Sequence, residues 1–317
     1  MNRKLLILAG LAFGSAPVIA QTGNFIHNGG VGQVEAPNPA SGCPTQPRAK
    51  LSFHCWVGQK IFFLPASNDL QHYGYQSFEM LGDEMHKSIP YQTLVGKTAT
   101  VQRISEDSIG SPILIARVDG GSLVVQAGII DESIDGIVLL RDLINAKRDL
   151  LGKTLWTHSE GINTINASGD KFGYVKLGRF SKVTVIDVVA GTYNDTPIRL
   201  ILKALDGRVG YEDVAYSENN TAVSLLEFDK FENLFFTINP RSIYKFSDTI
   251  WNALQRSQIL IGMNAQMVVL GWGRNPNSIN RTTTGNVVHE QWVYDGGKDS
   301  PARYVYFDNG RVTSVQD

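Results

Sequence analysis

The sequence lacks an excess of charge of either sign. Its 317 residues include 29 Lys and Arg against 30 Asp and Glu. The first twenty residues contain two bases and no acid, so the rest of the chain has 29 − 2 = 27 bases against 30 acids, a net charge of −3. Binding to nucleic acid or to an anionic membrane by bulk charge requires clustered Lys and Arg. The composition therefore excludes a broad basic surface, and its 43% hydrophobic and 19% charged residues are typical of a globular protein.

The sequence also lacks the motifs of common catalytic sites. Gly96-Lys97-Thr98 and Gly152-Lys153-Thr154 match only the end of a phosphate-binding loop, because Tyr91 and Lys147 stand where its first glycine is required. No G-x-S-x-G or H-E-x-x-H motif occurs. His158-Ser159-Glu160 brings acid–base groups together, but neighbours in a strand point apart, so we expect a surface loop there. We expect no catalytic residue, metal or cofactor; an enzyme site assembled from distant residues is the alternative.

No hydrophobic run reaches the roughly 20 residues of a membrane span. The amino end instead has the three parts of an export signal. Residues 3–4 are basic, residues 5–13 are apolar, and Val18-Ile19-Ala20 offers a cleavage site before Gln21. No cysteine follows the cut, so the lipid-attachment site of bacterial lipoproteins is missing. We predict a signal peptide over 1–20 and a mature chain that is periplasmic or secreted.

Cysteine is scarce, with Cys43 and Cys55 as the two copies. An exported chain meets an oxidising environment, in which such a pair closes a disulfide. The loop between them is short, so the chain-entropy contribution would be about 3 kcal/mol. Two unpaired, buried thiols are the alternative. A zinc site is not expected, because there is no C-x-x-C motif and His54 has no companion at ligand spacing.

The fold is expected to be mainly β, followed by an α+β segment. Residues 21–50 are rich in Gly and Pro and predict a linker. Short β-branched and aromatic runs predict two small β units, over 51–135 and 136–235. Strands are expected over 60–64, 98–101, 112–116, 123–125, 154–156, 173–175, 182–186 and 198–202. In strand length and rhythm the two units resemble Src-homology-three-like barrels.

A helix is expected over 138–151, where apolar residues recur at helical spacing and Gly152 is placed to end the helix. Further on, Ser247 is placed to cap a short helix, and 264–270 is expected to form another. The strands that follow are expected over 287–288, 290–294, 303–307 and 311–315, with turns at Gly296-Gly297 and Asn309-Gly310. Two helices and an antiparallel meander predict an α+β domain over 240–317.

Two groups of motifs in this last segment follow one another in order. The first contains Ile261-Gly262-Met263, Val268, Gly271-Trp272-Gly273 and Pro276. The second contains Glu290 to Tyr294 and then Tyr304 to Val312. Together, over about residues 245–317, they resemble a SmpA/BamE-like domain. The resemblance implies an α+β fold with the general layout of secreted β-lactamase inhibitor proteins, and contact with other proteins without a cofactor; the family's named member belongs to the machinery that assembles outer-membrane β-barrels.

Aromatic residues are the candidate contacts with a partner. Trp292 and Tyr294 share one face of their strand, and Trp292 is expected in the core. Trp272 stands between two glycines at a helix end, where it is either a surface anchor or a lid over the core. The residues predicted to bind a partner are Trp272, Tyr294 and Tyr306.

These features predict an exported, non-enzymatic protein that binds other proteins or acts as a scaffold at the bacterial cell envelope. One alternative is a module that binds cell-wall or other glycans, since aromatic side chains stack on sugars. The residues for that role would be Trp56, Phe62, Phe63, Tyr73, Tyr75, Tyr91 and Trp156. A second alternative is a secreted enzyme inhibitor.

Overall fold

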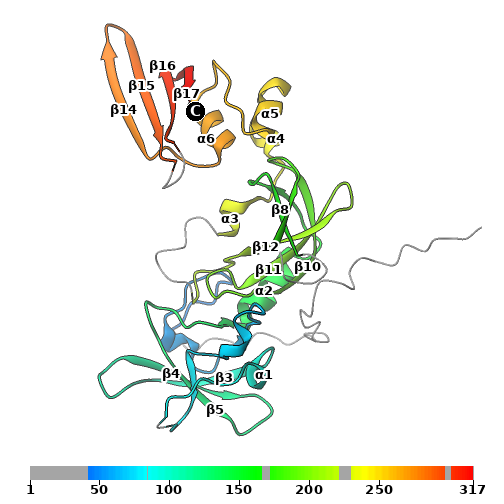
Figure 1. The fold of residues 1–317 in the computed structure, drawn as a ribbon, viewed down its shortest axis with the longest axis vertical. Helices are drawn as coiled ribbons and strands as arrows, with labels where there is room; N and C mark the ends of the chain where they lie inside the picture. The colour runs from blue at the N-terminus through cyan, green and yellow to red at the C-terminus, as the bar shows by residue number, and fades with distance from the viewer. Residues whose placement is uncertain (1–41, 84, 166–171, 221–229, 297–300, 317) are drawn as a thin grey trace, which may run out of the picture.

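The computed structural model describes residues 42–83, 85–165, 172–220, 230–296 and 301–316. The expected signal peptide and most of the expected linker lie outside the described residues. The chain is mainly β-sheet with few helices, as the sequence predicts. Three sheets follow one another along the long axis of the molecule (Figure 1). Within the described part, no helix is long and apolar enough to cross a membrane.

The first of these, the N-terminal sheet, has six strands in the order β2-β5-β4-β3-β1-β6. Their bounds are β1 Lys60–Phe63, β2 Phe78–Met80, β3 Thr98–Glu106, β4 Pro112–Val118, β5 Val124–Gly128 and β6 Ile137–Leu139. Three short helices accompany it: η2 Phe53–Trp56, η3 Gln71–Tyr73 and α1 Tyr91–Leu94. The predicted disulfide between Cys43 and Cys55 is present. His54 lies close to both sulfurs, but sulfurs joined to each other are not available as metal ligands.

The pair of strands β1 and β6 belongs to two hydrophobic cores. Ile61 and Phe63 of β1 point into the core of the N-terminal sheet, whereas Phe62 packs on the core of the next sheet. In β6, Val138 likewise faces away from its neighbours Ile137 and Leu139. Both strands are therefore shared between the first two layers. The analogy with Src-homology-three-like barrels stays a prediction.

The central sheet has seven strands in the order β13-β7-β10-β11-β12-β8-β9. Their bounds are β7 Thr154–Thr157, β8 Gly161–Ile165, β9 Phe172–Lys176, β10 Lys182–Ala190, β11 Ile198–Ala204, β12 Val209–Val214 and β13 Phe235–Phe236. Helix α2, Leu140–Leu150, packs against β10, and the short α3, Phe231–Leu234, precedes β13. The expected helix over 138–151 starts two residues later than predicted. Val138 and Leu139 lie in β6 instead, because a run buried on both faces does not distinguish strand from helix.

The C-terminal layer consists of helices α4, α5 and α6 and a four-stranded sheet in sequence order. Their bounds are α4 Pro240–Ile243, α5 Asp248–Gln255, α6 Ala265–Trp272, β14 Ser278–Thr284, β15 Val287–Tyr294, β16 Arg303–Asp308 and β17 Arg311–Gln316. The Ser247 hydroxyl accepts a hydrogen bond from the Ile250 N–H and so caps α5, as predicted. Asn264 caps α6 in the same way through the Met267 N–H, at 2.9 Å.

The structure differs from the predicted meander at its first strand. Residues 287–294 form one continuous strand, β15, rather than two, and β14 was not predicted. All residues of β14 are exposed, so its sequence carries no alternation of apolar and polar side chains. Figure 1 shows β14 at the outer edge of the sheet. Of the expected turns, Asn309-Gly310 connects β16 to β17, whereas Gly297 lies outside the described residues.

A buried polar network fastens the start of the folded chain to the central sheet. The Asn219 side chain accepts a hydrogen bond from the Leu51 N–H at 2.7 Å and donates one to Asp142 at 3.0 Å. The Ser217 hydroxyl donates a second hydrogen bond to the same oxygen of Asp142, at 2.6 Å. The other carboxylate oxygen of Asp142 has no partner. Burial raises the pKa of Asp142 to about 6, although these two hydrogen bonds and nearby Arg141 oppose the shift.

A pocket between the central sheet and the C-terminal layer

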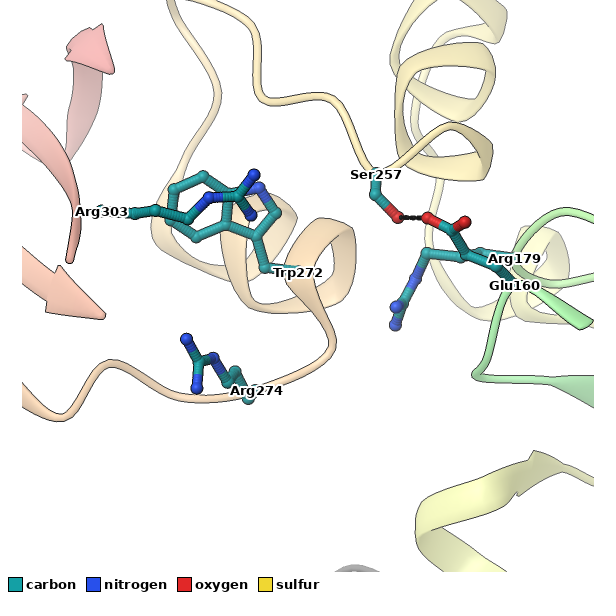
Figure 2. A pocket seen from close by; sticks show the side chains of 6 residues that line it. All are labelled: Glu160, Arg179, Ser257, Trp272, Arg274 and Arg303. Carbon is teal, nitrogen blue, oxygen red and sulfur yellow. Dashed lines mark hydrogen bonds between the residues drawn. The ribbon is translucent and has the colours of Figure 1, made fainter. Parts of the chain in front are cut away.

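A pocket of about 240 Å³ lies where the central sheet meets the C-terminal layer. Figure 2 shows the side chains that line it: Glu160, Arg179, Ser257, Trp272, Arg274 and Arg303. The first two come from turns of the central sheet, between β7 and β8 and between β9 and β10. The other four come from the C-terminal layer. Three guanidinium groups and one indole ring thus meet around one space.

The two sides of the pocket are held together by three contacts. The Arg179 N–H donates to the Gln255 carbonyl at 3.3 Å, and the Ser257 hydroxyl donates to the Glu160 carboxylate at 2.6 Å. Phe180, next to Arg179, inserts into the core of the C-terminal layer and packs edge-on against Trp251. The core of the C-terminal layer therefore includes a side chain of the central sheet, and the pocket walls are fixed relative to each other.

Arg179 is the most deeply buried of the three arginines that line the pocket. Arg179 is 9% exposed, and its Nε atom has no hydrogen-bond partner. Among the residues that the structure describes, no acceptor pairs with either Nη atom. Burial lowers the pKa of Arg179, an effect that Glu160 and Tyr174 partly oppose. An arginine nevertheless stays protonated at neutral pH, so a buried positive charge here has no direct counterion.

The two glycines beside Trp272 make room for this arrangement. Gly273 ends α6 with a left-handed backbone, at φ 73°, which favours glycine. A Cβ at Gly273 would lie 2.8 Å from Nη1 of Arg179 and closer still to Nη2. A Cβ at Gly271 would lie 2.7 Å from the Ile259 side chain. The guanidinium of Arg179 therefore packs directly on the Gly273 backbone, in space that any other residue would fill.

Trp272 forms an aromatic wall of the pocket. The Trp272 ring packs edge-to-face on Tyr294, with the two ring centroids 4.6 Å apart. The guanidinium of Arg303 lies over the indole, 5.1 Å from the ring centroid. Arg274 donates a hydrogen bond to the Asp295 carbonyl at 3.0 Å. Arg274 and Arg303 are both exposed and form the rim of the pocket. Figure 2 shows Arg179 across the pocket from Trp272 and Arg274.

Glu160 is the acidic side chain among the lining residues. It accepts hydrogen bonds from Ser257 and from Lys176, and these bonds lower its pKa, so it is ionised at neutral pH. Its neighbours in the sequence do not join it. Ser159 donates to the Gly161 carbonyl, and the His158 ring packs against Phe236 at 3.9 Å. His158-Ser159-Glu160 is thus a loop, and its three side chains do not converge.

The structure does not bring the three predicted binding residues together. Trp272 is half-buried and lines the pocket. Tyr294 is fully buried beneath Trp272, so it is part of the core and cannot contact a partner. Tyr306 alternates with the buried Val305 and Phe307 and lies on the opposite face of the sheet, where it bonds to Gln291 and Gln316. Trp292 is 7% exposed and packs on Phe307.

Most aromatic residues named for glycan binding are packed inside the molecule. Trp56, Phe63 and Tyr75 are buried in the N-terminal core, while Phe62 and Tyr91 pack against cores. Tyr73 is the most exposed of the set, at 52%. Stacking on a sugar requires an accessible ring face, so three of these seven residues cannot serve that purpose.

Sequence reasoning missed Glu160, Arg179, Ser257, Arg274 and Arg303 as pocket residues. They are far apart in the chain, and single arginines carry no motif. The one local signal was Gly271-Trp272-Gly273, whose glycines have structural reasons that only the packing reveals. Comparison of the chain with protein-family models, with curated proteins and with solved structures finds no match.

Proposed function

We propose that the chain is an exported protein that binds another protein of the bacterial cell envelope, and that the partner contacts the pocket between the central sheet and the C-terminal layer. The observation that carries the proposal is the pocket itself, where an indole ring and three guanidinium groups surround about 240 Å³. Trp and Arg dominate the energetically important positions of protein interfaces. The export signal, the disulfide and the resemblance of residues 245–317 to SmpA/BamE-like domains support a role outside the cytoplasm.

Site-specific photo-crosslinking in the native host tests this proposal. A photoreactive residue replaces Arg274 at the exposed rim of the pocket; a control chain carries it at Leu205, which is 79% exposed on the distant turn between β11 and β12. We expect one discrete protein adduct from position 274 and none from position 205. Adducts of equal pattern at both positions would show random collision and refute the proposal.

Two tryptophan variants separate binding from folding. Trp292→Ala removes a core ring and is expected to destabilise the C-terminal layer by about 3–5 kcal/mol. Trp272→Ala is expected to lower the melting temperature less, because its ring is only half-buried, yet to abolish the adduct from position 274. If Trp272→Ala melts as early as Trp292→Ala, Trp272 is a lid over the core and its role as an anchor is wrong.

A further inference from the structure

We propose that the pocket binds a carboxylate group, which the partner protein supplies from an acidic side chain or from its C-terminus. This inference rests on the proposed function, because it names the chemistry by which the partner is held. The carboxylate pairs with the Nη atoms of Arg179, while Trp272, Arg274 and Arg303 contact the chain that carries it.

The Arg179 guanidinium carries a buried charge to which no described residue offers a hydrogen-bond acceptor. A buried ion without a partner is strongly destabilising, and buried charges in folded proteins are normally paired. Arg179 is more than nine-tenths buried, its Nε is orphaned, and its Nη atoms face the pocket without a protein acceptor among the described residues. Because Gly273 has no Cβ, the guanidinium of Arg179 can occupy this position. The group that completes this site is an anion.

Among anions, the lining of the pocket favours a carboxylate. Glu160 lines the same pocket and is held ionised by Ser257 and Lys176. Its negative charge disfavours a dianion such as a phosphate monoester more than it disfavours a monoanion. The planar guanidinium fork matches a carboxylate with two parallel hydrogen bonds. One buried guanidinium therefore suits one planar, singly charged group.

The rim of the pocket suits a polypeptide that carries the carboxylate. Arg274 and Arg303 are exposed, and each is placed by a contact of its own, with the Asp295 carbonyl and with the Trp272 ring. Exposed cations attract an acidic segment from a distance, while the indole offers apolar area next to the anion. Together they fit the residues that flank a carboxylate in a polypeptide.

The test uses the purified mature chain and small carboxylate probes. N-acetylglycylglycine represents a C-terminus, and N-acetylaspartate amide represents an acidic side chain. Their uncharged counterparts are N-acetylglycylglycine amide and N-acetylasparagine amide, and inorganic phosphate is the competing anion. Titrations at constant ionic strength follow the Arg179 Nε–H signal by nuclear magnetic resonance, which reports the site without any substitution. We expect one or both carboxylates to shift this signal saturably and the amides to leave it unchanged.

Arg179→Met removes the charge and keeps the length of the side chain, with Arg208→Met as the control at an exposed arginine paired with Asp206. By thermal stabilisation in the presence of probe, we expect Arg179→Met to bind at least tenfold more weakly, as hydrogen bonds to a charged group predict, and Arg208→Met to bind as the wild type does. Arg179→Lys, which keeps the charge without the fork, serves if the methionine variant does not fold; it too is expected to bind more weakly.

Equal binding of carboxylates and amides, no binding of either carboxylate, or tighter binding of phosphate would overturn the inference. So would unchanged carboxylate binding by folded Arg179→Met. The proposed function fails separately. If the adduct from position 274 persists in Arg179→Met but disappears in Trp272→Ala, the partner binds in the pocket without a carboxylate; if the carboxylate binds but no adduct forms, the pocket does not hold an envelope protein.

Discussion

The buried carboxyl group of Asp142 makes the stability of the fold depend on pH in an unusual direction. In the unfolded chain an aspartate has a pKa near 3.8, whereas burial raises that of Asp142 to about 6. The folded state thus holds the proton more tightly. The stability that the fold gains from protonated Asp142 is complete below about pH 4 and is lost as the pH rises to about 6. A difference of about two pKa units corresponds to about 3 kcal/mol.

Asp142→Asn is expected to remove this dependence. The amide oxygen can accept the hydrogen bonds from Ser217 and Asn219, while the amide nitrogen takes the place of the carboxylate oxygen that has no partner. An unsatisfied buried donor costs about 1–3 kcal/mol. At pH 4 the protonated carboxyl group of the wild type also carries a donor without an acceptor on that oxygen. We therefore expect similar stabilities at pH 4 and a more stable variant at pH 7.5, where the wild type must bury a charge.

Urea unfolding at pH values from 4 to 7.5 measures this effect as the difference between the two proteins. The difference is needed because His158 acts in the opposite direction: burial first, and then Arg179, lowers its pKa to about 4, so its contribution is lost as the pH falls below 6.5. Asp206→Asn is the control; its exposed carboxyl group has a pKa lowered by the hydrogen bond to Arg208, so the variant is expected to leave the wild-type slope unchanged above about pH 5. A flat difference between wild type and Asp142→Asn across this range would refute the reasoning.

Two other changes test the glycine and cysteine positions. Gly262→Ala and Gly273→Ala both force alanine into a left-handed backbone, at about 1–2 kcal/mol each, but a Cβ at position 262 meets nothing within 4 Å. By thermal unfolding and carboxylate titration we expect similar strain in both and weakened binding only in Gly273→Ala; equal binding by the two would mean that the guanidinium position does not matter. Cys43 and Cys55 are expected to react with an alkylating agent only after reduction, which should lower the free energy of unfolding by up to about 3 kcal/mol. Free thiols in the chain isolated from its native host would contradict the disulfide.

The elements that the sequence predicts well are those with a local physical signal. The cap at Ser247 rests on a side chain that bonds to its own helix. The β-rich fold follows from short alternating runs, and the disulfide from the expected compartment. The predicted start of α2 was wrong. Val138 and Leu139 are buried in a strand shared by two cores, so their apolar side chains show neither a strand nor a helix periodicity. Strand β14 was missed because both its faces are exposed.

The pocket could not be predicted for a different reason. Arg179 and Trp272 stand 93 positions apart (272 − 179), and what brings them together is the packing of Phe180 into the core of the C-terminal layer. No spacing rule connects a turn of one sheet to the end of a helix in another layer. Because the pocket residues are so far apart in the sequence, only Trp272 among them, with its flanking glycines, was predicted to bind a partner, and the charged side chains around it were not.

The network around Asn219 links the start of the folded chain to the end of the central sheet. The hydrogen bond from the Leu51 N–H to Asn219 joins residues 168 positions apart, so the segment near Cys43 and Leu51 gains its final partner only after the central sheet has been made. Closing so long a loop is slow unless other contacts form first. Cys43 and Cys55 themselves pack into the core of the N-terminal sheet, so the disulfide loop can dock before Leu51 gains its bond to Asn219.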